Sequence, residues 1–283
     1  MLRLSHVTMA AFAAGILAAP AAAQDRRVIV GSRNDDRQSK DAFEWSGEIA
    51  RGQRLYIYNL NGGIKVEESN SRKVEVVARE YWRRGRPEDV TFMAKRVRSD
   101  RDIVVCAIWS GTDADCNEDG YHSRSRQDHG NRSNDIQVEF TIKLPAGAHV
   151  TAHTVNGDVE VAGVSGDVDV AAVNGRIDAE TTDGLIEAET TNGAIRARMS
   201  PAPTRNTSFR TVSGSITLSL PDNTNADIDA RTVNGTITSD FPITVGGQAG
   251  GGFSSRRLRG VLGRGGPHLT LETVNGGIRI EKR

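Results

Sequence analysis

The chain has 283 residues, and its 36 Lys and Arg residues balance its 36 Asp and Glu residues, so the formal net charge is zero. A nucleic-acid-binding protein normally needs a clustered positive field, and we therefore expect no nucleic-acid partner. Aromatic residues make up 5% of the chain, glycine occurs 30 times, and no heptad pattern is present. This composition excludes a coiled coil and favours a turn-rich chain with one extended domain or two small ones.

The first residues are typical of a secretory signal peptide. Arg3 gives a positive start, the apolar run VTMAAFAAGILAA follows, and Ala21–Ala23 supplies small residues for cleavage. The run is short for a bilayer span, no second long apolar run follows, and a buried helix is the alternative interpretation. We expect residues 1–23 to be removed, leaving 35 Lys and Arg against 36 Asp and Glu. The mature chain is then exported to the periplasm, the cell surface or the medium, without a transmembrane segment.

Residues 24–42 are polar and charged, and we expect a loose lead-in there. From residue 43 the hydrophobic period is two, which predicts strands. In DIQVEFTIKLP (135–145), five alternate apolar residues from Ile136 to Leu144 point to one face. Earlier expected strands are RLYIYNL, IKVEE, KVEVVARE, DVTFMAK and DIVVCAIW. Residues 43–150 thus form the N-terminal strands of a β domain that runs over 43–283, with 151–283 as a repeat region.

Cys106 and Cys116 are the only cysteines, in an insertion over residues 106–135. In an exported chain we expect a disulfide between them, since the acidic surroundings would suppress a reactive thiolate, the alternative. The same loop holds one candidate for calcium binding, formed by Asp115, Asn117 and Asp119. An EF-hand-like loop would need Glu at its twelfth position, where Arg126 stands, so a solvated acidic turn is favoured and no metal is expected.

A four-residue motif ending in Asn-Gly, Ser-Gly or Asp-Gly recurs at a spacing of nine from residue 154 to residue 193. It returns at spacings of twenty-one, at 211–214 and 232–235, and a last copy stands at 273–276, close to two further units away. Asn61-Gly62 is an outlying copy. The predicted structural corners are Asn156, Gly157, Ser165, Gly166, Asn174, Gly175, Asp183, Gly184, Asn192, Gly193, Ser213, Gly214, Asn234, Gly235, Asn275 and Gly276.

Two all-β architectures are compatible with this repeat. In a β-solenoid, each motif is a corner in the left-handed conformation, and two nine-residue half-turns make a coil of about eighteen residues. In an antiparallel meander or sandwich, each Asn-Gly pair is a hairpin turn. Small inward residues, the expanded spacing and the recurring Thr, Asn and Ser phase favour the solenoid.

Longer segments resemble the DUF4097 family. They are FEWSGEIARGQRLYIYNLNGGIKVEE, SGSITLSLPDNTNADIDARTVNGTI (213–237) and LRGVLGRGGPHLTLETVNGGIRIEK. The resemblance spans residues 43–283 and implies an exported or envelope-attached, adhesin-type β-helix-like domain without catalytic activity. The cysteine-bearing insertion departs from the plainer family pattern.

Outward spacer positions form an acidic row that includes Glu160, Asp169, Asp178 and Glu187, followed by Arg196. A solenoid would place Glu160, Asp178 and Arg196 in one column and the other two on the opposite face. Carboxylates on a β-helix face occur in polysaccharide-cleaving enzymes, so a carbohydrate-active enzyme is the alternative function. The rows also fall where a soluble sheet needs charge, and we expect no catalytic residues and no cofactor.

Arginines gather at Arg256, Arg257, Arg259 and Arg264, after the glycine-rich segment 246–252, and again at Arg83, Arg84 and Arg86. Ordinary solvated charge explains them, but either group could also meet an anionic envelope polymer. The leading hypothesis is a non-catalytic envelope scaffold or adhesin-like binding module, whose partner is an envelope protein or polysaccharide. Segments that interrupt the repeat, the Cys106–Cys116 loop and residues 246–266, are the first candidates for recognition.

Overall fold

The computed structural model describes residues 29–30, 37–109, 114–123, 135–245, 248–249 and 256–283. The expected signal segment lies outside these residues. Within them, strands dominate, and the one helical element is a 3-10 turn at Pro87–Asp89. No helix among the described residues has the length and apolar character needed to cross a bilayer.

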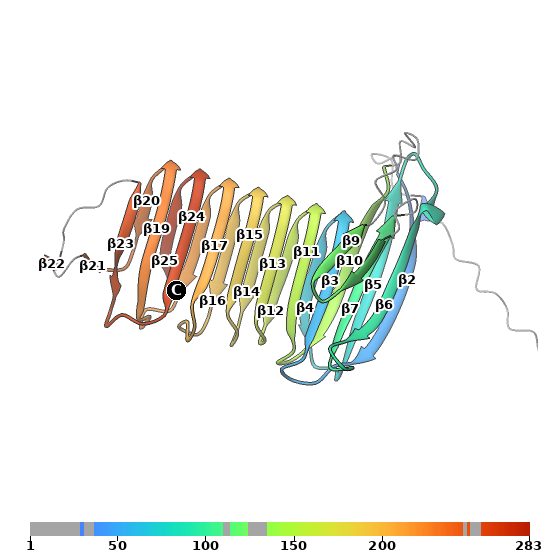
Figure 1. Ribbon diagram of the computed structural model, residues 1–283, viewed down its shortest axis with the longest axis horizontal. Helices are drawn as coiled ribbons and strands as arrows, with labels where there is room; N and C mark the ends of the chain where they lie inside the picture. Colours follow the sequence, from blue (N-terminus) through green and yellow to red (C-terminus); the bar gives the residue numbers. More distant parts are fainter. Residues whose placement is uncertain (1–28, 31–36, 110–113, 124–134, 246–247, 250–255) are drawn as a thin grey trace, which may run out of the picture.

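The described strands form two long sheets and a hairpin (Figure 1). Sheet A runs in the order β1 (Ile29–Val30), β2 (Gln38–Glu48), β5 (Lys73–Trp82), β10 (Gln137–Pro145), β4 (Ile64–Ser69), β12 (Val159–Val164), β14 (Ile177–Thr181), β16 (Ile195–Met199), β18 (Ile216–Leu220), β25 (Ile278–Lys282) and β20 (Ile237–Ser239). Sheet B runs in the order β22 (Gln248–Ala249), β21 (Ile243–Val245), β23 (Arg257–Leu262), β19 (Ala226–Asn234), β24 (His268–Asn275), β17 (Thr207–Ser213), β15 (Ile186–Asn192), β13 (Val168–Asn174), β11 (His149–Asn156), β3 (Arg54–Asn61), β7 (Asp102–Trp109) and β6 (Val90–Val97). The hairpin consists of β8 (Ala114–Asn117) and β9 (Gly120–Ser123).

The repeat is a β-solenoid, as predicted. In sheet B, Val150 of β11 pairs in parallel with Val168 of β13, which pairs with Ile186 of β15. In sheet A, Val159 pairs in the same way with Ile177. From β11 to β16, partners are eighteen residues apart in both sheets, so each of these coils consists of two nine-residue half-turns. Parallel pairing excludes the antiparallel meander.

The N-terminal strands extend the same two sheets with antiparallel pairs. In sheet A, β5 pairs with both β2 and β10, and in sheet B, β6 pairs with β7. Strand β2 begins at Gln38, earlier than the expected boundary at residue 43. Its polar first residues are held by cross-strand charge pairs, because Lys40 contacts Glu80 at 3.3 Å and Asp41 contacts Arg79 at 2.7 Å.

The last repeat does not follow its predecessors in space, contrary to the serial order that the spacing predicts. Strands β24 and β25 lie between the coil formed by β17 and β18 and the coil formed by β19 and β20. The forty-one-residue spacing therefore does not hold two further units in line. The chain leaves the stack after β20, forms β23 antiparallel to β19, and then inserts its last coil.

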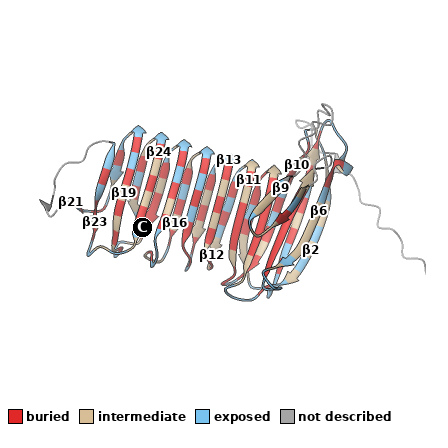
Figure 2. Ribbon diagram, viewed as in Figure 1, coloured by how far each residue is buried: buried red, intermediate tan, exposed pale blue. Residues whose placement is uncertain are grey.

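Between the sheets lies a narrow core of alternating inward residues (Figure 2). Most are Val, Ile, Leu and Ala, with Phe140 and Phe209 as the bulkiest fully buried side chains. Small branched side chains fill the space between two closely spaced sheets without voids. All five predicted inward residues of the 135–145 segment are buried: Ile136, Val138, Phe140, Ile142 and Leu144.

Corner glycines stack in two columns along the solenoid, one that includes Gly157, Gly175 and Gly193 and one that includes Gly166 and Gly184. An added Cβ at Gly175 would lie 1.8 Å from the carbonyl oxygen of Gly157, and one at Gly193 would lie 1.9 Å from that of Gly175. The left-handed conformation predicted for the corners is wrong for most of them. Positive φ is absent at six of the eight: Gly166, Gly175, Gly184, Gly193, Gly214 and Gly235. Close backbone approach, rather than an unusual φ, explains the glycine at these positions.

Candidate functional site

The predicted Cys106–Cys116 disulfide is present. It fixes the β8–β9 hairpin against the outer face of sheet B, where Tyr56 and Tyr58 are buried beneath it. The Tyr58 hydroxyl donates a hydrogen bond to the Glu118 carbonyl at 3.1 Å. Burial, reinforced by neighbouring Tyr56 and acidic side chains, raises the pKa of Tyr58, so its hydroxyl stays protonated. The inserted loop is thus a covering hairpin rather than an open site.

The calcium candidates lie on this hairpin and have protein partners. Asp115 forms an ion pair with Lys95 at 2.9 Å. The Asn117 side-chain oxygen accepts a hydrogen bond from the Asp119 backbone N–H at 2.8 Å, which is an Asx turn. Among the described residues, no group of three or more His, Cys, Asp or Glu side chains could hold a metal ion. An ion pair and a turn hydrogen bond therefore explain the acidic residues of this loop.

Glu160, Asp178 and Arg196 form the predicted column on sheet A, because they pair in register across β12, β14 and β16. Basic residues neutralise this column. Lys65 contacts Glu160 at 3.5 Å, and Arg198 contacts Asp178 at 2.7 Å. Cross-strand ion pairs on a solvent-facing sheet therefore account for this acidic row.

The neighbouring Glu180 lies on the same face, two residues after Asp178. Burial opposes its ionisation, but hydrogen bonds from Arg283 and Arg198 prevail and lower the pKa of Glu180. The sheet A carboxylates therefore act as partners of arginines.

Asp169 and Glu187 pair in register on sheet B, the other predicted face. His153 lies beside Asp169, with 3.6 Å between Nε2 and Oδ1. His149 is the first residue of β11, and its Nδ1 accepts a hydrogen bond from the Asp167 backbone N–H at 2.8 Å. Burial lowers the pKa of His149. His149 thus has a hydrogen-bond partner, whereas Nε2 of His153 is shielded from solvent and forms no hydrogen bond with the described residues.

Among the described residues, four large hydrophobic side chains are exposed, and each is the valine of a corner motif. Three are neighbours on sheet B: Val212 of β17, Val274 of β24 and Val233 of β19, with 45%, 39% and 54% of their surface exposed. We call these three residues the valine stripe. Val173 is the fourth and lies two coils away, beyond Thr191.

A groove of about 620 Å³ runs along the valine stripe. Four charged residues in its wall occupy facing register positions on adjacent strands. Arg210 faces Glu272, Glu272 faces Arg231, and Arg231 faces Arg257. Arg256 also lines the groove, and arginines outnumber its two glutamates, Glu189 and Glu272. The predicted Arg-rich segment thus supplies two of the groove's four arginines, while Arg259 pairs with Asp229 at 2.6 Å.

Sequence reasoning missed the valine stripe, although a signal was present. In each TVNG motif the threonine is buried and donates its hydroxyl proton across the stack, as Thr232 does to the Gly276 carbonyl at 2.8 Å. Alternation along a strand then directs the following valine outward. The recurrence of an outward valine in the AVNG, TVSG and TVNG motifs is the anomaly that could have been noticed.

The two-sheet solenoid with stacked Asn-Gly corners places the chain among β-solenoid proteins. Residues 124–281, more than half of the chain, match the Toastrack DUF4097 family. The protein belongs to this family. No curated protein sequence matches the chain.

Two solved structures are similar to the chain at 12% sequence identity. One is described as a "putative cell adhesion protein" from Clostridium sporogenes; the match covers 85% of this chain and 99% of that chain, with a TM-score of 0.47. The other is described as a "putative adhesin" from Bacteroides fragilis; the match covers 85% of this chain and 96% of that chain, with a TM-score of 0.22.

Proposed function

We propose that the protein is a non-catalytic, exported binding module of the cell envelope, with an adhesin-like scaffold role. The valine stripe is the observation that carries this proposal. Neighbouring exposed valines rimmed by polar residues are typical of a surface that contacts a partner. The solenoid backbone holds them at fixed positions, so little ordering is needed on binding.

Charge at the stripe defines what the partner should present. Four arginines and two glutamates line the groove. Arg210 is paired with Glu272 at 3.2 Å, and Arg231 forms two hydrogen bonds with the Asp229 carboxylate, at 2.9 and 2.7 Å. Arg256 and Arg257 add further positive charge to the lining of the groove. A partner with apolar side chains flanked by carboxylates complements this surface.

Binding to isolated envelopes tests the proposal. We expect saturable binding of the wild-type chain, reduced about tenfold when Val212, Val233 and Val274 are all replaced by serine, because the desolvated contact is lost. Val173→Ser is the matched control, since it changes the same corner position outside the groove, and it should bind as the wild type does. Equal losses in the two variants, or none, would contradict the proposed surface.

The non-catalytic part has a separate test. Incubation with envelope polysaccharides should yield no new reducing ends or shortened chains. Turnover that is abolished by Asp178→Asn or Asp169→Asn would establish an enzyme in place of the binding module.

A further inference from the structure

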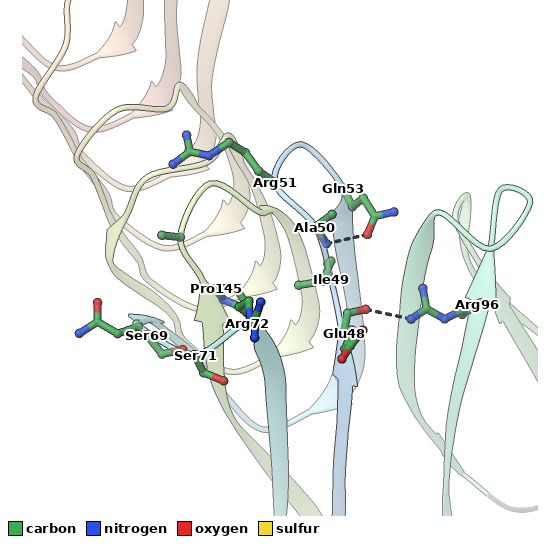
Figure 3. A pocket seen from close by; sticks show the side chains of 12 residues that line it. Glu48, Ile49, Ala50, Arg51, Gln53, Ser69, Ser71, Arg72, Arg96 and Pro145 are labelled. Atoms are coloured by element: carbon green, nitrogen blue, oxygen red, sulfur yellow. Dashed lines mark hydrogen bonds between the residues drawn. The ribbon is translucent and has the colours of Figure 1, made fainter.

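Three turns meet beside the first coil of the repeat and enclose a second cleft. They are the β2–β3 turn, the β4–β5 turn and the β10–β11 turn, and Arg96 of β6 closes one side (Figure 3). The cleft has a volume of about 730 Å³. This size lies within the range of ordinary ligand sites, roughly 300–1,000 Å³. We call it the turn cleft.

Positive charge dominates the turn cleft. Arg51, Arg72 and Arg96 line it from three separate elements, against one carboxylate, that of Glu48. The Arg96 guanidinium donates hydrogen bonds to the backbone carbonyls of Glu48 at 2.9 Å and Asp100 at 3.0 Å. These carbonyls orient the group without neutralising it. Anionic ligands are therefore favoured in the cleft.

Arg51 and Arg72 differ from most solenoid arginines. Within the described part of the chain, neither makes a hydrogen bond or ion pair. Elsewhere, Arg176 pairs with Asp158 at 3.0 Å and Arg279 with Glu281 at 2.6 Å. Arg176 and Arg279 on the flat faces are thus paired with carboxylates, whereas Arg51 and Arg72 remain available at the turn cleft.

Gly147 allows Arg51 to lie along the β10–β11 turn. A Cβ on Gly147 would be 2.8 Å from both Cγ and Cζ of Arg51, and the glycine has a φ of 76°. Figure 3 shows Arg51 at one side of the cleft, Arg96 at the other and Arg72 between them. The charges are spread along the cleft instead of converging on one point, which suits a chain with several anionic groups.

Small polar side chains complete the lining. The Ser69 hydroxyl is shielded from solvent and has no hydrogen-bond partner among the described residues. Asn70 and Ser71 follow it, and the Gln53 side chain accepts from the Ala50 N–H at 2.7 Å, which leaves its amide protons available. A shielded hydroxyl without a partner is costly unless a ligand satisfies it. These groups match hydroxyl-rich ligands.

We propose that the turn cleft binds a segment of an acidic polysaccharide, with carboxylate or phosphate substituents paired to Arg51, Arg72 and Arg96 and sugar hydroxyls bonded to the Ser69 side chain and its neighbours. None of the described residues that line this cleft is aromatic, so they do not offer the stacking on which single-stranded nucleic acids depend. The inference rests on the proposed binding role and adds the chemistry of one partner.

Calorimetric titration of the full chain with defined oligosaccharides tests the inference. The probes are oligogalacturonate, which carries carboxylates, a glycerol-phosphate oligomer, which carries phosphates, neutral dextran oligomers and oligo-dT. We expect saturable binding of one or both acidic oligomers, weakening with added salt, and none of dextran. Tighter binding of oligo-dT, or no saturable binding of either acidic oligomer, would overturn the proposal.

Matched variants locate the interaction. Arg51→Gln with Arg72→Gln should weaken acidic oligomer binding about tenfold, since charge-assisted hydrogen bonds are lost. Arg176→Gln with Arg279→Gln removes the same charge elsewhere and should change affinity by no more than about twofold. Equal losses in the two pairs would show a general charge effect and refute the cleft.

Ser69→Ala supplies a further readout. Because the hydroxyl has no partner in the free protein, its removal should leave the thermal midpoint unchanged while weakening oligosaccharide binding. A lowered midpoint with unchanged affinity would assign Ser69 to folding instead.

This inference and the proposed function can fail separately. Envelope binding that depends on the valine stripe, without any binding of acidic oligomers, would refute the turn cleft alone. Cleavage of a bound oligomer would refute the non-catalytic role, while the arginine variants would still report whether it binds at the cleft.

Discussion

The backbones of adjacent coils are in close contact at the corner glycines. The carbonyl of one corner lies where the next corner would carry a Cβ, at 1.9 Å for Gly214 on Gly193 and 2.0 Å for Gly276 on Gly214. Threonines of the same motifs stabilise this close contact, as the Thr273 hydroxyl does by donating a hydrogen bond to the Gly214 carbonyl at 2.9 Å. Asparagines add an outer ladder, with Asn192 donating to Asn174 at 2.8 Å. One motif thus joins the coils through three kinds of contact.

Gly175→Ala should destabilise the protein by about 3 kcal/mol, because the backbone of the preceding coil cannot move away without loss of strand pairing. Gly277→Ala is the control: its Cβ would lie 3.3 Å from the Thr236 carbonyl and meet nothing closer. Urea unfolding measures both. Similar free energies of unfolding for the two variants would contradict close approach as the reason for glycine.

Asp229 provides a pH-dependent contribution. The hydrogen bond from Arg231 is the main cause that lowers the pKa of Asp229 from 3.8 to about 2; partial burial opposes it and Arg259 assists. A carboxyl with a depressed folded-state pKa stabilises the protein above its unfolded pKa and loses this contribution as pH falls. The stability difference between wild type and Asp229→Asn should therefore be full above about pH 4 and vanish towards pH 2. Urea unfolding across this range measures it, and a difference that is constant with pH would contradict the pairing.

Among the elements, the β8–β9 hairpin is the one that depends on a covalent link. It packs over Tyr56 and Tyr58 through a small cluster separate from the main core. Strands β13 to β16, by contrast, are paired on both sides along their length. The hairpin should therefore open without unfolding the stack.

Replacement of Cys106 and Cys116 by alanine removes a crosslink between residues ten apart, which the chain-entropy model values at about 3 kcal/mol. We expect faster amide hydrogen exchange in β8 and β9 and unchanged exchange in β13–β16. Uniformly faster exchange throughout the solenoid would show that the hairpin is part of the global folding unit.

At the scale of the whole molecule, the solenoid is a stack of coils whose register repeats every eighteen residues from β11 to β16. Stacked repeats contact only their neighbours, so stability is close to a sum over coils and interfaces. Joining Arg176 to Ile195 by deletion of residues 177–194 would let β16 take the place of β14 against β12, since Val159 then faces Ile195 instead of Ile177.

This eighteen-residue deletion should leave a folded protein with cooperative urea unfolding and a reduced m-value. Deletion of the nine residues 177–185 is the control, because it shifts every later strand to the opposite sheet and should abolish cooperative unfolding. Cooperative unfolding in both deletions, or in neither, would contradict the coil assignment.

Local periodicity was sufficient to predict the solenoid, its eighteen-residue coil, its corners and the column formed by Glu160, Asp178 and Arg196. Local periodicity could not predict that β24 and β25 insert between earlier coils, because any two TVNG motifs fit the same stacking site equally well. The prediction of left-handed corners was wrong for most corners, because Asn-Gly pairs occur in turns of several backbone conformations. The turn cleft had no sequence signal, since Arg51, Arg72 and Arg96 come from turns and strands that only the fold brings together.

Parallel strands in constant register leave hydrogen-bonding edges on which further copies could assemble without limit. The last strand of sheet A, β20, has three residues, and sheet B ends beyond the Arg257- and Arg259-bearing strand β23 in the short antiparallel strands β21 and β22. At the other end, β2 and β6 are the last long strands of the two sheets, joined across the core by stacked Phe43 and Phe92 rings 5.2 Å apart. These ends interrupt the register, so end-to-end fibre growth is opposed and the molecule remains a rod of defined length.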